Sequence, residues 1–345
     1  MTLRFFLYIC VRRKSGTMKR SEFLKLCGGF ALAATISQSA VAAMKSLKDD
    51  GVPDLKLDVR PLKLNVGATK PFKALHFSDT HFTRVFDYES ERKRKLAVAR
   101  QRTFPWAEHY FDMQMDYAQQ HNLMIIHTGD MNDLITEANL KHVAEQTRVG
   151  DWIFAPGNHD FSLFIGEAWE DEAYKAQSYD MVQAVFPNDL TFASRVINGV
   201  NFVSLMNGYY YVTEYQAERM KEEVKRGLPI VLVCHVPFYT PKHCEWVLKS
   251  NNNYATAVMG TPREITENFR PNPNYPKDHW KQCRLQMRTN DTTMAFIEWL
   301  KQQPELKAIL CGHNHHFYEE QFSPTAVQYI VGAGYKGAAY EVEFV

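Results

Sequence analysis

The feature that most constrains this 345-residue sequence is a series of short apolar runs that alternate with stretches of helical periodicity. Short runs that stay apolar, without polar alternation, are typical of strands buried on both faces. Their alternation with amphipathic helices favours an α/β fold built on a mostly parallel sheet. The predicted strands are 72–78, 123–128, 152–155, 201–206, 230–234 and 308–311, and the predicted helices are 107–120, 137–148, 170–186, 215–225 and 292–302.

Three other segments stand outside this alternation. Residues 55–59 alternate between apolar and polar side chains, which predicts an additional edge strand. Residues 327–345 are apolar but broken by glycines, and we interpret them as a closing hairpin. Residues 240–291 are rich in Asn, Pro and Thr, and a loop of that length in a compact domain is usually functional. We interpret this insertion as a lid or a substrate-specificity element.

The first 43 residues have the three parts of a secretory signal. A basic head precedes an apolar run, Leu26–Ile36, and small residues up to Ala43 follow it. The eleven-residue run is too short for a membrane helix, which needs about 20 residues. We therefore predict an exported protein, periplasmic or secreted, whose mature domain is 44–345. Arg20-Ser21 resembles a twin-arginine motif with one arginine replaced, so the export route stays open, and Cys27 lies too early in the run for a lipid anchor.

The charge and the cysteines of the remaining chain indicate which functions and structural roles are compatible with it. Residues 44–345 carry 33 Lys and Arg against 38 Asp and Glu, so their net charge is −5. An excess of acid does not favour general nucleic-acid binding. Cys234 and Cys311 end apolar runs and are expected to pack as small hydrophobic residues. Cys244 and Cys283 share the insertion, and the sequence leaves open whether they form a disulfide.

Polar groups that can bind metals or act as acids follow five of the predicted strands directly. Because ligands of open α/β sheets bind at the carboxyl ends of the strands, we expect these groups to converge. The five segments are Asp79-Thr80-His81, Gly129-Asp130-Met131-Asn132-Asp133, Gly157-Asn158-His159-Asp160, His235 alone, and Gly312-His313-Asn314-His315.

The donor atoms in these segments suit a dinuclear metal centre. They are carboxylate oxygens, an amide and imidazoles without a thiolate, a set that favours Mn, Fe or Zn. Two divalent ions with two carboxylates and a bridging hydroxide would carry a net charge of about +1, which suits a phosphate ester as substrate and the hydroxide as its attacker. The seven predicted ligands are Asp79, His81, Asp130, Asn158, His235, His313 and His315.

The order of these motifs resembles the calcineurin-like metallophosphoesterase family, whose blocks are D-x-H, G-D-x-x-D, G-N-H-D, a lone His and G-H-x-H. All five blocks occur in order between Asp79 and His315. The resemblance implies a four-layer α/β/β/α sandwich with two metal ions. It also implies a phosphoesterase, that is, a phosphatase or a phosphodiesterase.

The resemblance further implies a role for each site residue. Asp130 would bridge the two ions. His159 would contact the phosphate and protonate the leaving oxygen, and Asp160 would orient His159. Asp133 stands where purple acid phosphatases have a tyrosine ligand. One ion would be held by Asp79, His81, Asp130 and His315, and the other by Asp130, Asn158, His235 and His313.

Two other functions are compatible with the same motifs. The first is a binding or scaffold protein that keeps the fold without turnover. The second is a different dinuclear metallohydrolase that acts on amides or lactones. The sequence does not determine the physiological substrate, the choice between monoester and diester, the identity of the metal or the oligomeric state.

Overall fold

The computed structural model describes residues 53–165, 170–273 and 279–345. The predicted signal segment, including Cys27, lies outside the described residues. Residues Lys56–Val345 form one folded unit, which holds all the predicted site residues. No helix in the described part of the chain has the length and apolar character needed to cross a membrane.

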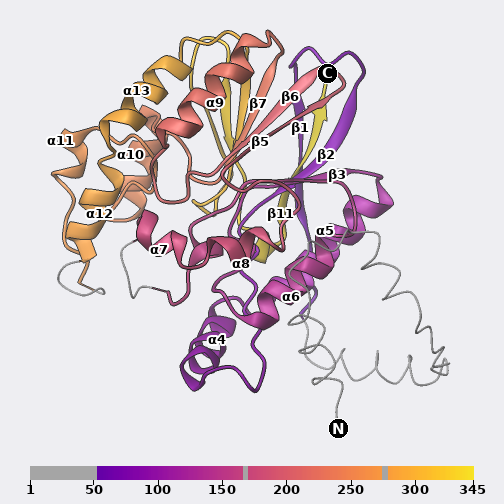
Figure 1. Cartoon of the computed structure of the whole chain (residues 1–345), viewed down its shortest axis with the longest axis vertical. Helices are drawn as coiled ribbons and strands as arrows, with labels where there is room; N and C mark the ends of the chain where they lie inside the picture. The colour runs from indigo at the N-terminus through magenta and orange to yellow at the C-terminus, as the bar shows by residue number, and fades with distance from the viewer. Residues whose placement is uncertain (1–52, 166–169, 274–278) are drawn as a thin grey trace, which may run out of the picture. The chain divides into compact units, whose positions relative to one another are not determined.

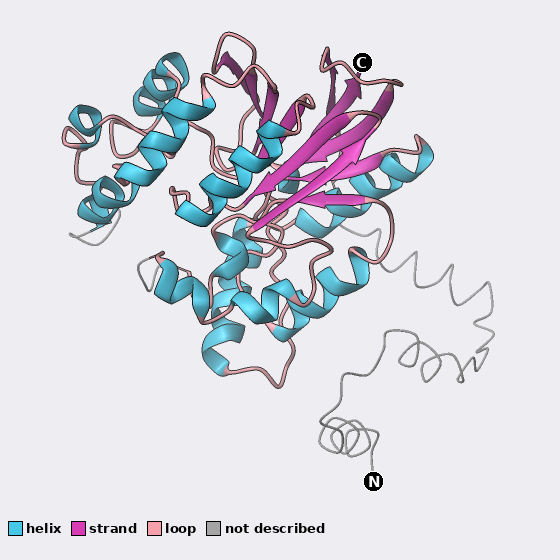
Figure 2. Ribbon diagram, turned by 45° about the horizontal axis from the view of Figure 1, so that its top comes forward, coloured by secondary structure: helices cyan, strands magenta, loops and turns pink. Residues whose placement is uncertain are grey.

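Two mixed β-sheets form the centre of this unit (Figure 2). The first has the strand order β1-β11-β2-β3-β4 and the second the order β5-β6-β7-β8-β10-β9. Strands β2, β3 and β4 run parallel, as do β6, β7 and β8. The strand bounds are β1 Asp58–Leu64, β2 Phe72–Phe77, β3 Met124–His127, β4 Trp152–Phe154, β5 Phe192–Ile197, β6 Val200–Leu205, β7 Ile230–Cys234, β8 Leu306–Cys311, β9 Tyr318–Gln321, β10 Val327–Ile330 and β11 Ala338–Phe344.

Helices connect most of the parallel strands, as crossover connections require. Helix α9, for example, begins at a capping box in which Thr213 accepts the backbone N–H of Gln216 and the Gln216 side chain accepts that of Thr213. The helix bounds are α4 Glu91–Thr103, α5 Ala107–Gln120, α6 Glu137–Gln146, α7 Glu172–Ala176, α8 Tyr179–Gln183, α9 Glu214–Lys225, α10 Pro241–Ser250, α11 Arg263–Thr266, α12 His279–Met287 and α13 Asp291–Leu300, with 3₁₀ turns η1 His159–Phe161 and η2 Gly334–Lys336.

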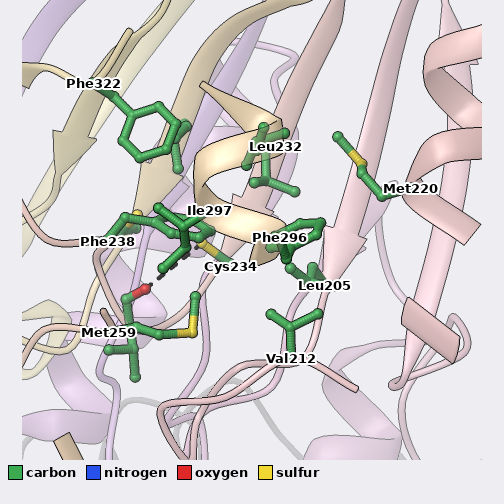
Figure 3. Packing of buried hydrophobic residues seen from close by; sticks show 14 of the residues in the cluster. Leu205, Val212, Met220, Leu232, Cys234, Phe238, Met259, Phe296, Ile297 and Phe322 are labelled. Carbon is green, nitrogen blue, oxygen red and sulfur yellow. Dashed lines mark hydrogen bonds between the residues drawn. The ribbon is translucent and has the colours of Figure 1, made fainter. Parts of the chain in front are cut away.

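Three apolar clusters match the three interfaces of a four-layer sandwich. One lies between the sheets and joins, for example, Phe202 of β6 to Phe344 of β11. A second packs helix α5 against the outer face of the first sheet. The third packs α9 and α13 against the second sheet (Figure 1), and Figure 3 shows Met220, Leu232 and Phe296 within it. The predicted α/β/β/α architecture is confirmed.

The predicted core strands are present within one or two residues of their predicted ends. The expected closing hairpin is wrong, because β10 pairs with β8 and β9 whereas β11 pairs with β1 and β2 in the other sheet. The predicted helix 170–186 is two short helices, α7 and α8. The edge strand begins later than expected, at Asp58, and continues to Leu64.

The insertion 240–291 carries helices α10, α11 and α12 rather than irregular chain alone.

The cysteines whose side chains the structure describes are free. Within the insertion, Cys244 is buried, and the side chain of Cys283 lies outside the described residues. Cys234 and Cys311 are free and fully buried, with their sulfur atoms 3.7 Å apart. They pack in the apolar cluster under α13, as expected for small hydrophobic residues.

Candidate metal centre

The seven predicted ligands lie in the loops that follow β2, β3, β4, β7 and β8, so both sheets contribute to one site. The loops are joined to one another by backbone hydrogen bonds. Asp79 donates to the carbonyl oxygen of Gly129 at 2.9 Å, and Gly312 donates to that of His235 at 3.0 Å. The convergence that the sequence predicts is therefore present.

One group of potential ligands contains Asp79, His81 and His315, whose donor atoms lie within 4.8 Å of one another. His315 Nε2 is 3.1 Å from Asp79 Oδ1. His81 Nε2 is 3.9 Å from the same oxygen and also 3.9 Å from Asp130 Oδ2. These are the four residues that the family resemblance implies for one ion.

A second group contains Asp130, His235 and His313. His235 Nε2 lies 3.3 Å from Asp130 Oδ2 and 3.1 Å from His313 Nδ1. Oδ2 of Asp130 therefore faces a histidine of each group, which is the position a bridging carboxylate needs. Asn158 precedes His159 in the chain, and the backbone N–H of His159 donates to Asp130 Oδ1 at 2.8 Å, so Asn158 lies next to this group.

Two unpartnered buried atoms show that this arrangement fits metal ions. His81 Nε2 and Asn158 Oδ1 are buried and have no hydrogen-bond partner within the described structure. A buried polar atom without a partner costs free energy, and an imidazole nitrogen and an amide oxygen are both metal ligands. Together with the carboxylates of Asp79 and Asp130, these residues form an oxygen and nitrogen donor set suited to two divalent cations.

The four imidazoles are oriented by their second ring nitrogens. In each ring one nitrogen faces the centre and the other meets a hydrogen-bonding group, as is usual for metal-binding histidines. The oriented nitrogens and their partners are His81 Nδ1 with Asp133 Oδ1 (3.0 Å), His235 Nδ1 with the Thr128 carbonyl oxygen (2.6 Å), His313 Nε2 with the Tyr210 hydroxyl (2.7 Å) and His315 Nδ1 with the Tyr335 hydroxyl (3.4 Å).

Five of the predicted ligands have left-handed backbone conformations, a region that L-residues other than glycine rarely adopt. Each such residue costs on the order of 1–2 kcal/mol, so the surrounding structure must hold it in place. Sharp turns of this kind bring the side chains back over the strand ends. The residues and their φ angles are Asp79 (57°), His81 (54°), Asp130 (54°), His313 (67°) and His315 (58°).

His159 is oriented by Asp133 and not by Asp160, the residue that the resemblance suggested. His159 Nδ1 lies 2.9 Å from the carbonyl oxygen of Asp133 and 3.3 Å from its Oδ1. A carbonyl oxygen only accepts, so Nδ1 donates and Nε2 is the nitrogen available to a substrate. Asp133 also holds His81, and Arg100 binds its carboxylate through two N–H groups, at 2.6 and 2.8 Å.

Asp160 instead fixes the backbone of two ligand loops. Its Oδ2 accepts the N–H groups of Asp130 and Gly157, both at 2.9 Å, and its Oδ1 accepts that of Asn132 at 2.9 Å. Gly157 is required at this point, since a Cβ there would lie 2.2 Å from Asp130 Oδ1. Asp160 is thus a structural support of the turn on which Asp130 lies.

The electrostatics of the centre favour cations. Burial opposes ionisation of Asp130, but the nearby His235 and His159 hold the pKa of this carboxyl well below its usual range. Burial also lowers the pKa of His159, yet the carboxylates of Asp130 and Asp133 outweigh it and raise that pKa to about 10. The carboxylates thus draw positive charge into a buried site, which is the environment that binds divalent ions.

Several residues of the site could not be identified from the sequence. Asp133 lies in the second motif block, but its contact with His159 was not anticipated. Arg100 comes from α4, a helix that is not among those predicted from the sequence. Glu170 accepts from Asn158 Nδ2 at 3.3 Å and from Gln286 Nε2 at 3.0 Å, so it links a predicted ligand to the insertion.

The family model of the calcineurin-like phosphoesterases matches residues 72–317, which is more than half of the chain. The chain belongs to the calcineurin-like phosphoesterase family. The match includes all seven predicted ligands and His159. A search of curated proteins gave no match.

Three solved structures that are similar to the chain share 14% sequence identity or less with it. A dimetal phosphatase from Danio rerio shares 10% identity, with 79% of this chain and 91% of that chain covered and a TM-score of 0.39. A putative 5'-nucleotidase from Staphylococcus aureus shares 13% identity over 77% and 49%, with a TM-score of 0.37. A phosphopantetheinyl hydrolase from Mycobacterium tuberculosis shares 14% identity over 76% and 90%, also with a TM-score of 0.37.

Replacement of Asp160 tests its role as a support of the ligand loops. Asp160→Asn retains the shape but offers one acceptor oxygen to three N–H groups, so we expect the free energy of unfolding to fall by at least about 2 kcal/mol. We also expect fewer bound metal ions per chain, because the Asp130 turn loses its anchor. Urea denaturation and elemental analysis measure the two effects.

Asp189→Asn is the matched control, since the exposed Asp189 also accepts two backbone N–H groups, from Thr191 and Phe192, but far from any predicted ligand in sequence. It should leave the metal content unchanged. Equal metal content and equal stability in Asp160→Asn and the wild type would contradict the assigned role.

Proposed function

We propose that this protein is a metal-dependent phosphoesterase that hydrolyses a phosphate monoester or diester. The observation that carries the proposal is the convergence of seven ligands on two adjacent groups that share Asp130, with His159 beside them. Membership of the calcineurin-like phosphoesterase family supports the same reaction class.

The chain itself would hold two divalent ions. Asp79, His81 and His315 supply one group and Asn158, His235 and His313 the other, while Asp130 faces both. When bound, the ions would polarise the phosphoryl oxygens and lower the pKa of the attacking water. His315 has a partly exposed side chain, at 35%, which places the open side of the centre next to it.

His159 is positioned to act as the general acid. Its Nδ1 is fixed by Asp133, so Nε2 is directed away from that carboxylate and can donate a proton to the leaving oxygen. The side chain of His159 is 19% exposed, so a substrate can reach it. Arg100 holds Asp133 in turn and thereby fixes the position of the acid.

Removal of the bridging carboxylate tests the metal centre. Asp130→Asn halves the negative charge of the pair formed with Asp79, so we expect loss of metal binding and of hydrolysis of p-nitrophenyl phosphate and bis-p-nitrophenyl phosphate. The Mn²⁺-loaded wild type should lose the same activity on chelation. Activity that survives both treatments would exclude the mechanism.

Replacement of the general acid should separate metal binding from turnover. We expect His159→Ala to keep both ions but to reduce kcat by roughly 10²–10⁴-fold, the usual contribution of general acid catalysis. With a substrate whose leaving group needs no proton, the kcat of His159→Ala should fall less. The exposed His109 provides a control, since His109→Ala should have wild-type kcat, and an unchanged kcat in His159→Ala would remove the proposed role.

Metal content also distinguishes the proposal from a scaffold that keeps only the fold. Such a protein should hold well under two ions per chain. No observation in the described structure favours amides or lactones over phosphate esters as substrates, and a substrate panel with the metal-loaded protein compares these classes directly.

We also propose that the protein is exported, on the basis of the basic head, short apolar run and small-residue end of residues 1–43. Expression of the full chain in a bacterial host tests this. We expect a protein in the periplasm or medium whose first residue lies near Met44. A full-length chain that stays in the cytoplasm would contradict it.

A further inference from the structure

A separate pair of histidines lies beside the metal centre, where the insertion meets the loop after β8. His243 comes from α10, and His316 follows the last predicted ligand in the chain. Their Nε2 atoms are 3.1 Å apart. The side-chain amide of Asn314 lies 3.3 Å from His243 Nε2. Three potential ligand groups therefore meet at one point that belongs to neither of the two groups above.

A hydrogen bond to the backbone fixes the tautomer of His316. Its Nδ1 faces the carbonyl oxygen of Asn314 at 2.6 Å, and because that oxygen only accepts, Nδ1 carries the hydrogen. In the neutral ring the Nε2 atom of His316 therefore presents its lone pair to His243.

Two buried atoms of the cluster have no hydrogen-bond partner among the described residues. They are Asn314 Oδ1 and His243 Nδ1, and the side chain of His243 is fully buried. A half-turn of the Asn314 amide exchanges its oxygen and nitrogen, which would bring Oδ1 to the position 3.3 Å from His243 Nε2. A hydrogen bond between the two rings alone would leave Asn314 Oδ1 unsatisfied, whereas a bound ion would accept this oxygen as a ligand.

The spacing of the cluster matches that of ligands around a small cation. A tetrahedral ion with bonds of about 2.0–2.1 Å keeps its ligand atoms about 3.4 Å apart. The separations of 3.1 and 3.3 Å are close to this value. The ring nitrogens of His235 and His313, within the predicted dinuclear centre, are also 3.1 Å apart.

We propose that His243, His316 and Asn314 form a third metal site, for a late first-row divalent cation such as Zn²⁺. Two imidazoles and an amide oxygen suit Zn²⁺, whereas Mn²⁺ and Mg²⁺ prefer carboxylates and water. The rings of Trp246 and Tyr318 pack beside the site, with centroids 4.1 Å from His316 and 4.7 Å from His243.

An ion at this point would fasten the insertion to the catalytic loop. His243 lies on α10, and Asn314 and His316 alternate with the predicted ligands His313 and His315. Glu320 strengthens the same junction by accepting the backbone N–H of His243 at 2.7 Å. The third ion would therefore have a structural role, distinct from the hydrolysis proposed above.

Elemental analysis of the full chain tests this site directly. After saturation with Zn²⁺ and removal of free metal, we expect three ions per wild-type chain and two in His316→Ala. We choose to replace His316 because it is partly exposed, whereas His243 is fully buried and its replacement would disturb the packing more. His121→Ala removes an exposed histidine and should retain three ions. Saturation with Mn²⁺ should give two ions in the wild type.

A second variant separates this site from the dinuclear centre. Asp79→Asn/Asp130→Asn removes both carboxylates of that centre and should retain one Zn²⁺ ion, which the additional change His316→Ala should abolish. Equal zinc content in the wild type and His316→Ala, or no zinc in Asp79→Asn/Asp130→Asn, would overturn the third site. Neither result would affect the dinuclear centre, whose own failure would appear as one ion in the wild type and none in His316→Ala.

Discussion

Two buried carboxylates, Asp79 and Asp130, impose the constraint on which the rest of this structure depends. Both side chains are almost completely shielded from water, at 0% and 2% exposure. An ionised carboxylate at such a depth requires positive charge and hydrogen-bond donors around it. The chain supplies imidazoles and backbone N–H groups, and divalent ions would complete the arrangement. The centre is therefore a site in which metal binding and local stability are coupled.

The same constraint explains why the backbone is strained where the ligands lie. Five of the predicted ligands have left-handed backbone conformations that cost free energy, and they lie at the ends of strands in a densely packed sandwich. Asp160 contributes to this by holding three backbone N–H groups of the adjoining loops. The free energy gained by packing the three apolar clusters thus offsets the cost of these conformations at the predicted metal centre.

The insertion is connected to the loops of the candidate metal centre at two points. Gln286 of α12 donates to Glu170, which accepts from the predicted ligand Asn158. His243 of α10 meets His316, next to the predicted ligand His315. We propose that this insertion contributes to substrate choice. Such a segment needs a fixed position relative to the reacting atoms, since small displacements of a substrate are costly for catalysis. These two connections supply that position, and the proposed third ion strengthens the second of them.

The sequence alone determined the core strands and the positions of the seven predicted ligands, because both are encoded locally. A strand buried on both faces is a short apolar run, and each polar motif follows its strand directly, as Asp79 and His81 follow β2. Only the tertiary structure decided which sheet received β11, which residue orients His159, and that Arg100 lies behind Asp133. These relations join residues that are tens to hundreds of positions apart, such as Tyr340 with His76 in β11 and β2. No local pattern encodes them, since they arise from the packing of two sheets whose strands are not in chain order.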